Sequence, residues 1–154
     1  MELSSILNQE AVRILPSVTS KKRLFQELSD LLETAHTVPA GVALDALQER
    51  ESLGPTGVGH GIALPHARIP GIDRVVGLFA RLDKPLDFDA VDRLPVDLVF
   101  ALFAPEDAGV EHLKALALVS RTMRNETLCK KLRANNDSAT LHAMRTEVES
   151  SRAA

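Results

Sequence analysis

The chain of 154 residues contains one cysteine and neither tryptophan nor tyrosine. A single thiol, Cys129, excludes an intramolecular disulfide and a cysteine-rich zinc site. We interpret Cys129 as a packing residue, because an isolated cysteine usually behaves as a small apolar side chain. With only five phenylalanines, the sequence also offers few rings on which bases or sugars could stack. These absences argue against a disulfide-stabilised protein and against a carbohydrate or single-strand binding module.

An excess of positive charge and a long apolar run are missing as well. The 18 basic residues stand against 21 acidic ones, for a net charge of −3, so no nucleic-acid partner is expected. No apolar run approaches the roughly 20 residues of a membrane span, and no signal-peptide pattern opens the chain. We therefore expect a cytoplasmic protein without membrane insertion. The length predicts a single domain over residues 1–154, with a core from about residue 5 to residue 148.

Apolar periodicity predicts helices that alternate with strands. Ser20 is suited to cap the first helix, and Gly54-Pro55 to end the second. The predicted helices span residues 20–35, 40–53, 109–123, 126–134 and 138–148, before a frayed tail at 150–154. The apolar face of the third is predicted to contain Val110, Leu113, Leu116, Ala117 and Val119. Strands are predicted at 74–82 and 95–105, and the second is apolar enough to be covered on both faces. This order predicts an α/β sandwich.

Residues 54–71, "GPTGVGHGIALPHARIPG", contain five glycines and three prolines, and we expect loops around one short apolar strand at 62–64. The glycines let the backbone approach a ligand closely, and successive N–H groups can form an anion-binding concavity. The first turn of the helix at 109–123 would supply further unpaired N–H donors. The segment is neither a P-loop nor a dinucleotide fingerprint.

Five histidines are candidates for chemistry. His36 and His142 are predicted to lie on the solvated surface, whereas His60 and His66 fall in the glycine-rich segment and His112 follows a helix start. Residue types alone leave two interpretations of His66 open: a hydrogen-bonded residue at a strand end, or a nucleophile that takes up a phosphoryl group. A second histidine could then donate to the phosphoryl oxygens. His60 and His66 stand six residues apart, which matches no common zinc spacing, so no metal site is predicted.

Two separated segments carry a family resemblance. "RESLGPTGVGHGIALPHARI" (50–69) resembles the active-site segment of enzyme IIA domains of the mannitol, fructose and nitrogen classes of the bacterial phosphotransferase system. "VDLVFALFAPEDAGVEHLKALALVS" (96–120) is similar to a second segment of that family, in which a strand, a proline and a His-Leu pair follow one another. The resemblance implies a single α/β/α sandwich domain, with a mixed sheet flanked by helices on both faces. It also implies a phosphotransferase component that needs no cofactor.

The resemblance further implies roles for individual residues. His66 falls on the phosphoacceptor, which is loaded by an HPr-like carrier protein, and His112 falls on the histidine that stabilises the phosphoryl group. Arg50 falls on the active-site arginine, whose planar fork suits phosphoryl oxygens. Pro55 stands where relatives often have serine. The implied phosphate pocket is lined by Thr56, by the backbone of Gly57, Gly59 and Gly61, and at its rim by His60.

The chain is most similar to the nitrogen-regulatory branch. That branch implies a regulator whose phosphorylation state alters binding to partners such as potassium-transport regulators or sensor kinases. Two alternatives stay open at this point. One is a sugar-specific enzyme IIA of the fructose or mannitol class, which passes its phosphoryl group to an enzyme IIB during sugar uptake. The other is a metallohydrolase that uses His60, His66 and His112.

Overall fold

The computed structural model describes residues 1–143. Two short 3-10 turns, η1 (Leu3–Ser5) and η2 (Gln9–Ala11), precede the sheet. The strands are β1 (Val12–Leu15), β2 (Gly57–Gly59), β3 (Ile62–Ala63), β4 (His66–Ile69), β5 (Val76–Leu86) and β6 (Val96–Pro105). The helices are α1 (Lys21–His36), α2 (Ala40–Ser52), α3 (Val110–Met123) and α4 (Glu126–Ala134).

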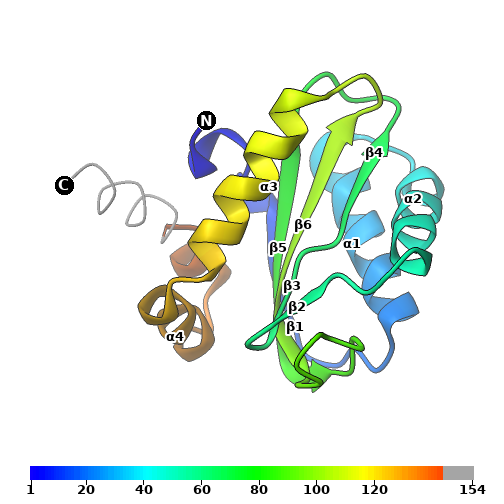
Figure 1. The fold of residues 1–154 in the computed structure, drawn as a ribbon. Coiled ribbons are helices and arrows are strands. Elements are labelled where there is room, and N and C mark those ends of the chain that lie inside the picture. The colour runs from blue at the N-terminus through cyan, green and yellow to red at the C-terminus, as the bar shows by residue number, and fades with distance from the viewer. Residues whose placement is uncertain (144–154) are drawn as a thin grey trace.

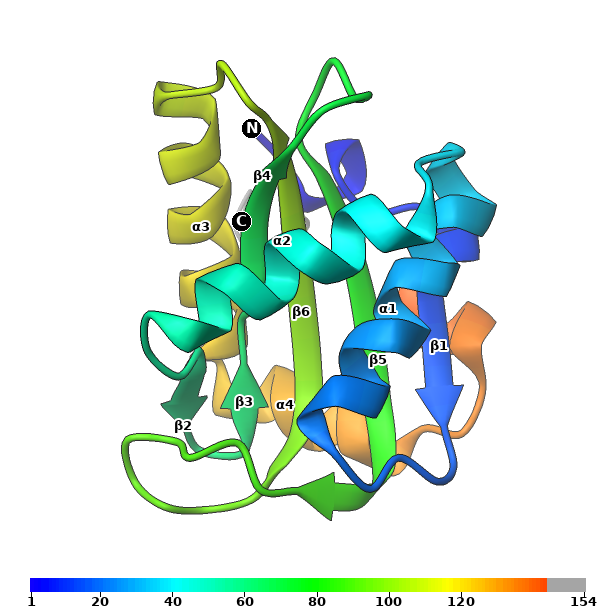
Figure 2. The ribbon, with the colours of Figure 1, turned by 90° about the vertical axis from the view of Figure 1, so that its right-hand side faces the viewer.

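The six strands form one mixed sheet between two layers of helices. Its order is β1-β5-β6-β3-β2, and β4 pairs with β6 further along the same edge as β3. The β5–β6 pair is antiparallel, whereas β1 runs parallel to β5. Helices α1 and α2 cover one face, and α3 and α4 cover the other (Figures 1 and 2). The predicted α/β/α sandwich with a mixed sheet is thus confirmed.

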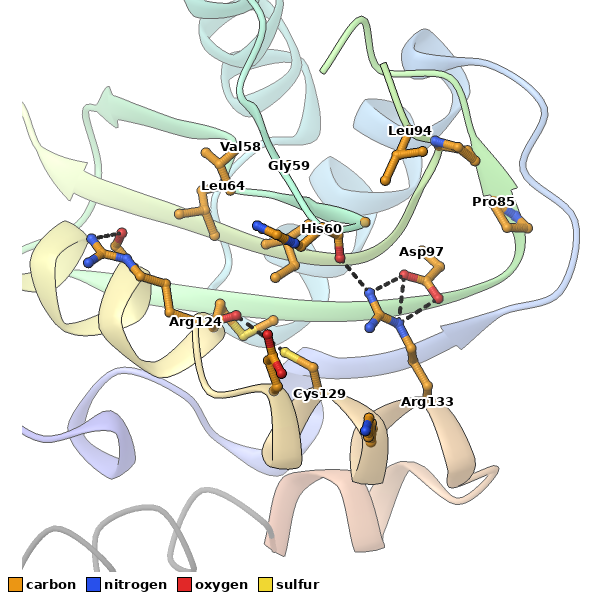
Figure 3. A pocket seen from close by; sticks show the side chains of 17 residues that line it. Val58, Gly59, His60, Leu64, Pro85, Leu94, Asp97, Arg124, Cys129 and Arg133 are labelled. Carbon is orange, nitrogen blue, oxygen red and sulfur yellow. Dashed lines mark hydrogen bonds and ion pairs between the residues drawn. The ribbon is translucent and has the colours of Figure 1, made fainter. Parts of the chain in front are cut away.

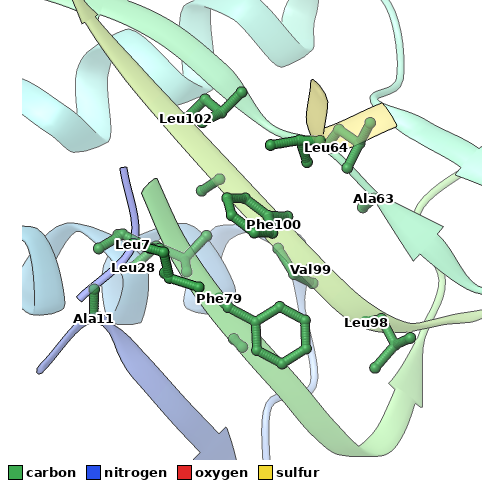
Figure 4. Packing of buried hydrophobic residues seen from close by; sticks show 14 of the residues in the cluster. Leu7, Ala11, Leu28, Ala63, Leu64, Phe79, Leu98, Val99, Phe100 and Leu102 are labelled. Atoms are coloured by element: carbon green, nitrogen blue, oxygen red, sulfur yellow. The ribbon is translucent and has the colours of Figure 1, made fainter. Parts of the chain in front are cut away.

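Strand β6 is the centre of the core. From Leu98 to Ala104 every side chain is buried, on both faces of the sheet. Figure 4 shows Leu98, Phe100 and Leu102 along this strand, with Phe79 on the neighbouring β5. Because successive side chains of a strand point to opposite faces, an unbroken apolar run needs cover on both sides, and the helical layers supply it. The prediction of a doubly buried strand at 95–105 is confirmed.

Helix ends follow the predicted chemistry. The Ser20 hydroxyl accepts a hydrogen bond from the Arg23 N–H at 3.0 Å and caps α1. Helix α2 ends at Ser52, before Gly54-Pro55. Cys129 is buried at 4% exposure and donates to the Met123 carbonyl oxygen, as a packing residue should. Burial raises the pKa of its thiol.

The buried face of α3 differs from the predicted one. Val110 and Leu113 are 63% and 66% exposed. The residues that pack inward are His112, Ala115, Leu118, Val119, Thr122 and Met123. Of the predicted apolar residues, Val119 is buried and Leu116 packs partly buried against the core, whereas Val110, Leu113 and Ala117 are exposed. A histidine, a threonine and an alanine on the buried face weaken its apolar signal, so the spacing of the larger apolar residues predicted only part of that face.

Two histidines predicted to be solvated are half-buried instead. His36 ends α1 against the segment that follows β4, and burial lowers its pKa, with a smaller effect of the Arg74 charge. The ring of His142 contacts the Leu7 carbonyl oxygen through Nε2 at 3.3 Å. The N-terminal turns that contact His142 carried no clear sequence pattern, so this burial could not be anticipated.

The glycine-rich segment holds three short strands, β2, β3 and β4, where one was predicted. Each has only two to four residues, too few for a periodicity to show. The strand predicted at 74–82 runs from Val76 to Leu86, and β1 was not predicted. Residues 138–143 are helical as expected, while the rest of the helix predicted at 138–148 and the tail at 150–154 lie outside the described residues. Within residues 1–143, no helix is long and apolar enough to cross a membrane.

Candidate functional site

His66 is the first residue of β4, and its backbone is fixed by the central strand. Strand β4 runs parallel to β6, with His66 opposite Leu102. The Leu102 N–H donates to the Pro65 carbonyl oxygen at 2.9 Å, immediately before the histidine. Pro65 restricts the preceding backbone to extended conformations. The position of the imidazole is therefore set by the core of the sheet rather than by a mobile loop.

Two hydrogen bonds define the tautomer of His66. Its Nδ1 lies 2.9 Å from the Leu64 carbonyl oxygen, which can only accept, so Nδ1 carries the proton. Its Nε2 lies 3.3 Å from Nε of Arg50, which can only donate, so Nε2 presents a lone pair. Burial lowers the pKa of His66 most; the hydrogen bond to Leu64 partly opposes this, the Arg50 charge lowers the pKa further, and Glu51 has the smallest effect, which raises it. The ring is thus neutral and nucleophilic at neutral pH.

Arg50 reaches His66 from the last turn of α2. Its Nη1 donates to the Gly54 carbonyl oxygen at 3.0 Å, which ties the guanidinium to the end of its own helix. The side chain is half-buried between α2 and β4. The fixed guanidinium lies on the Nε2 side of the His66 ring, where it could stabilise the negative charge of a bound group.

Glu51 organises the segment behind Arg50, and residue chemistry alone did not single it out. Its carboxylate accepts from the Thr56 backbone N–H at 3.0 Å and from the Thr56 hydroxyl at 2.7 Å. It also pairs with Nζ of Lys21 at 3.2 Å, although its side chain is only 7% exposed. The Thr56 carbonyl oxygen in turn accepts from the Leu64 N–H. Glu51 is therefore connected through Thr56 and Leu64 to the ring of His66. In the sequence, the importance of Glu51 was indicated only by its position next to Arg50 at the start of the family-resembling segment 50–69.

His112 approaches His66 from the opposite helical layer. It lies in the first turn of α3 and is 7% exposed, with its ring centroid 5.8 Å from that of His66 at an interplanar angle of 69°. Within the described part of the chain, its buried Nε2 has no hydrogen-bond partner. Burial lowers the pKa of His112, and the neighbouring His66 and Arg68 lower it further. An unsatisfied buried nitrogen is costly, and such an atom beside a nucleophile is suited to an incoming ligand oxygen.

Of the other predicted pocket residues, Thr56 and Gly57 lie behind the His66 site, and Gly59, His60 and Gly61 lie beside a different cleft. Thr56 is 3% exposed and lies behind the site, bonded to Glu51. Gly57 packs against the far side of its strand, where an added Cβ would lie 2.9 Å from that of Ala90. Gly59, His60 and Gly61 form a turn beside a separate cleft, which neither His66 nor His112 lines. The structure thus brings together His66, Arg50 and His112, with Thr56 one contact removed.

The same side chains offer no evident metal centre. Among the described residues, no group of three or more His, Cys, Asp or Glu side chains is placed to hold a metal ion. The chemistry open to the site is that of a neutral imidazole nucleophile, a fixed guanidinium and a second imidazole. Such a set suits the uptake of a phosphoryl group.

Comparisons with known proteins agree with this chemistry. The model of the family described as "Phosphoenolpyruvate-dependent sugar phosphotransferase system, EIIA 2" matches residues 5–147. A nitrogen regulatory protein of Bradyrhizobium diazoefficiens is 42% identical over 144 residues, which cover 94% of each chain. The nitrogen regulatory protein of Escherichia coli is 39% identical over 150 residues, 97% of this chain and 92% of that one. The crystal structure of the nitrogen regulatory protein IIA-Ntr from Neisseria meningitidis has a TM-score of 0.84 at 35% identity, over 93% of this chain and 98% of that one.

Proposed function

The chain belongs to the EIIA 2 family of the phosphoenolpyruvate-dependent sugar phosphotransferase system, and we propose that it carries a phosphoryl group on Nε2 of His66. In this proposal an HPr-like carrier protein supplies the group, and the phosphorylation state of the chain regulates partner proteins, as in the nitrogen-type system. The observation that carries the proposal is the pair of hydrogen bonds that leaves the lone pair of a neutral ring at Nε2.

The transfer itself balances without a further reactant. The Nε2 lone pair of His66 attacks the phosphorus on the carrier's phosphohistidine, a new P–N bond forms, and the P–N bond of the carrier breaks. The bonding electron pair returns to the carrier's imidazole. The proton stays on Nδ1, and the Leu64 carbonyl oxygen that accepts its hydrogen bond stabilises the positive charge that the ring gains. Because the bond formed and the bond broken are alike, alignment and charge stabilisation are the main requirements.

Arg50 and His112 would hold the transferred group. The Arg50 guanidinium, which bonds Nε2 in the unphosphorylated state, can turn its donors to the phosphoryl oxygens. The group adds about −1.5 to −2 charges, and an anion of that size raises the pKa of a nearby imidazole. His112 would then become a charged donor from the opposite helical layer.

Regulation would follow from the same charge. A partner that docks over His66 meets a charged phosphoryl group in one state and a neutral imidazole in the other, which changes both its encounter rate and its affinity. The similarity to nitrogen regulatory proteins supports a regulatory role, for which we propose partners such as potassium-transport regulators or sensor kinases.

The test is phosphorylation in a reconstituted system. The chain is incubated with enzyme I, an HPr-like carrier and phosphoenolpyruvate, and intact mass spectrometry counts the acid-labile phosphoryl groups. We expect one group on the wild-type chain and on the matched control His36→Ala, and none on His66→Ala. Normal labelling of His66→Ala would overturn the assignment. Rapid discharge of the phosphorylated chain to an enzyme IIB of the fructose or mannitol class would instead identify a sugar-uptake component.

A further inference from the structure

A cleft of about 970 Å³ lies on the α3/α4 side of the sheet, apart from the His66 site. Its walls come from the β2–β3 turn, from the start of β6 with the segment before it, and from the α3–α4 corner. Figure 3 shows His60 and Leu64 on one side of this cleft, Leu94 and Pro85 on a second, and Cys129 and Arg133 on a third. Its volume is in the range of small-molecule sites, which are typically about 300–1,000 Å³.

The β2–β3 turn is held in an unusual conformation at the edge of this cleft. Gly59, His60 and Gly61 have φ values of 98°, 58° and 78°. A non-glycine residue with positive φ is strained and persists only where its surroundings hold it. The His60 N–H donates to Oδ2 of Asp92 at 2.8 Å, and its carbonyl oxygen accepts from Nη2 of Arg133 at 2.8 Å. Figure 3 shows the His60 side chain beside Leu64 while its carbonyl oxygen faces Arg133.

The chemistry of the walls favours an organic anion. The apolar part of the lining includes Val58, Ile62, Leu64, Leu94 and Met123. Arg133 is already paired with Asp97 through its Nε at 2.9 Å. The remaining charged lining residues are Arg124, Lys130 and Glu126, so positive charge exceeds negative charge by one, apart from the imidazole of His60. A ligand with an apolar body and one negative group would match both parts of this lining, whereas bare phosphate would leave the apolar walls uncovered.

Leu64 connects this cleft to the nucleophile. Its side chain lines the cleft, and its backbone carbonyl oxygen accepts the Nδ1 proton of His66 at 2.9 Å. Its N–H donates to the Thr56 carbonyl oxygen at 2.9 Å. A ligand that packs on the Leu64 side chain would therefore act on the hydrogen bond that sets the tautomer of His66.

We propose that this cleft binds a small organic monoanion with an apolar body, and that its occupancy changes phosphoryl transfer at His66 through Leu64. The second half of this inference rests on the proposed function, whereas the first half does not. The β2–β3 turn then has a role outside the phosphoryl site, since it places the His60 side chain on the wall of the cleft beside Leu64.

Binding is tested with anilinonaphthalene sulfonate, an apolar ring system that carries one negative group. N-phenylnaphthylamine, which has the rings without the sulfonate, is the matched neutral probe. Titration calorimetry should give one site for the sulfonate, with a Kd at least about fivefold lower than for the neutral probe. Backbone NMR shifts should change at the lining residues. The charge reversal Lys130→Glu on α4 should raise the Kd about fivefold, whereas Lys22→Glu on α1, outside the cleft, should leave it unchanged.

Several results would overturn the inference. Equal affinity for both probes would show an apolar groove without preference for an anion. Shift changes elsewhere, or an unchanged Kd in Lys130→Glu, would place the probe outside the cleft. Coupling is measured separately, from the imidazole nitrogen shifts of His66 and from the rate of phosphorylation with and without saturating probe. We expect the rate to change by about fivefold, and an unchanged rate with unchanged His66 shifts would refute the coupling.

The variant His66→Ala separates this inference from the proposed function. It cannot be phosphorylated at position 66, but it should still bind anilinonaphthalene sulfonate at one site, with backbone shift changes at the same lining residues. Normal phosphorylation of the wild-type chain without binding at the cleft would remove this inference and leave the function intact. Binding at the cleft without phosphorylation of His66 would remove the proposed function and leave the binding site in place.

Discussion

Truncation of Glu51 to alanine should destabilise the chain far more than its position at a helix end would suggest. Its carboxylate accepts the Thr56 N–H, the Thr56 hydroxyl and Nζ of Lys21, at 3.0, 2.7 and 3.2 Å. Glu51→Ala leaves both Thr56 donors without a partner inside the protein. Lys21 keeps the Phe88 carbonyl oxygen and gains access to water, so its loss is small.

The magnitude follows from these groups. An unsatisfied buried donor costs about 1–3 kcal/mol, and Thr56 is only 3% exposed. For its N–H and hydroxyl together we expect Glu51→Ala to lower the free energy of unfolding by about 3 kcal/mol. In Glu51→Gln the amide can still accept the N–H and can donate to the hydroxyl, so the expected loss is about 1 kcal/mol. Glu49→Ala, an exposed carboxylate on the same helix, is the control, with a change within about 0.5 kcal/mol.

Urea unfolding followed by far-UV circular dichroism measures these differences, and the absence of tryptophan makes this probe preferable to intrinsic fluorescence. A loss in Glu51→Ala as small as that of Glu49→Ala would refute the reasoning, because it would mean that Thr56 finds other partners. An equal loss in Glu51→Gln and Glu51→Ala would show that the charge, and not the hydrogen bonds, matters.

Three further outcomes are expected. His112→Asn should slow phosphorylation of His66 by about 10²-fold, as removal of one charge-stabilising donor does in other enzymes. Its circular dichroism spectrum should stay that of wild type. An unchanged transfer rate would contradict the role of His112. Arg50→Lys keeps the charge but loses the planar fork, so stopped-flow measurements should show transfer about tenfold slower; a wild-type rate would mean that charge alone suffices. The pKa values of His66 and His112 are lowered by burial, so below about pH 6.5 the unfolded state binds protons first and the free energy of unfolding falls with decreasing pH. The double variant His66→Gln/His112→Gln should show a shallower fall than wild type in urea titrations between neutral and acidic pH, and an equal slope would refute this assignment.

The sequence supported the framework of the fold because its main elements carry strong periodic signals. The apolar run from Val96 to Pro105 could only be a strand covered on both faces, and Ser20 marked the start of α1. Strand β1 and the strands near His66 have two to four residues each, and their pairing with distant partners decides their conformation. Local propensity cannot predict such elements, because β1 depends on pairing with β5, β3 and β4 depend on pairing with β6, and β2 pairs with β3.

The candidate site was partly predictable for a similar reason. His66, Arg50 and His112 could be singled out from two separated motifs, and the structure places all three together. The link from Glu51 through Thr56 to the Leu64 carbonyl oxygen could not be predicted. It consists mainly of hydrogen bonds to backbone atoms, which any residue type could make. His60 illustrates the converse case. It stands six residues before His66 in the chain, yet the positive φ values at residues 59–61 place it at a different cleft.

The position of β4 in the sheet explains why two helical layers can act on one imidazole. Strand β4 pairs only with β6 among the described strands, so its other edge is open at the boundary between the layers. Helix α2 lies on one face of the sheet beside β4, and α3 lies on the other (Figure 2). Arg50 therefore reaches His66 from α2, while His112 lies beside the same ring from α3. A histidine in a central strand would have one face only and no path to solvent. Placement at this open edge gives the ring a fixed backbone and neighbouring side chains from both faces, which are features that the proposed phosphoryl transfer from a carrier protein requires.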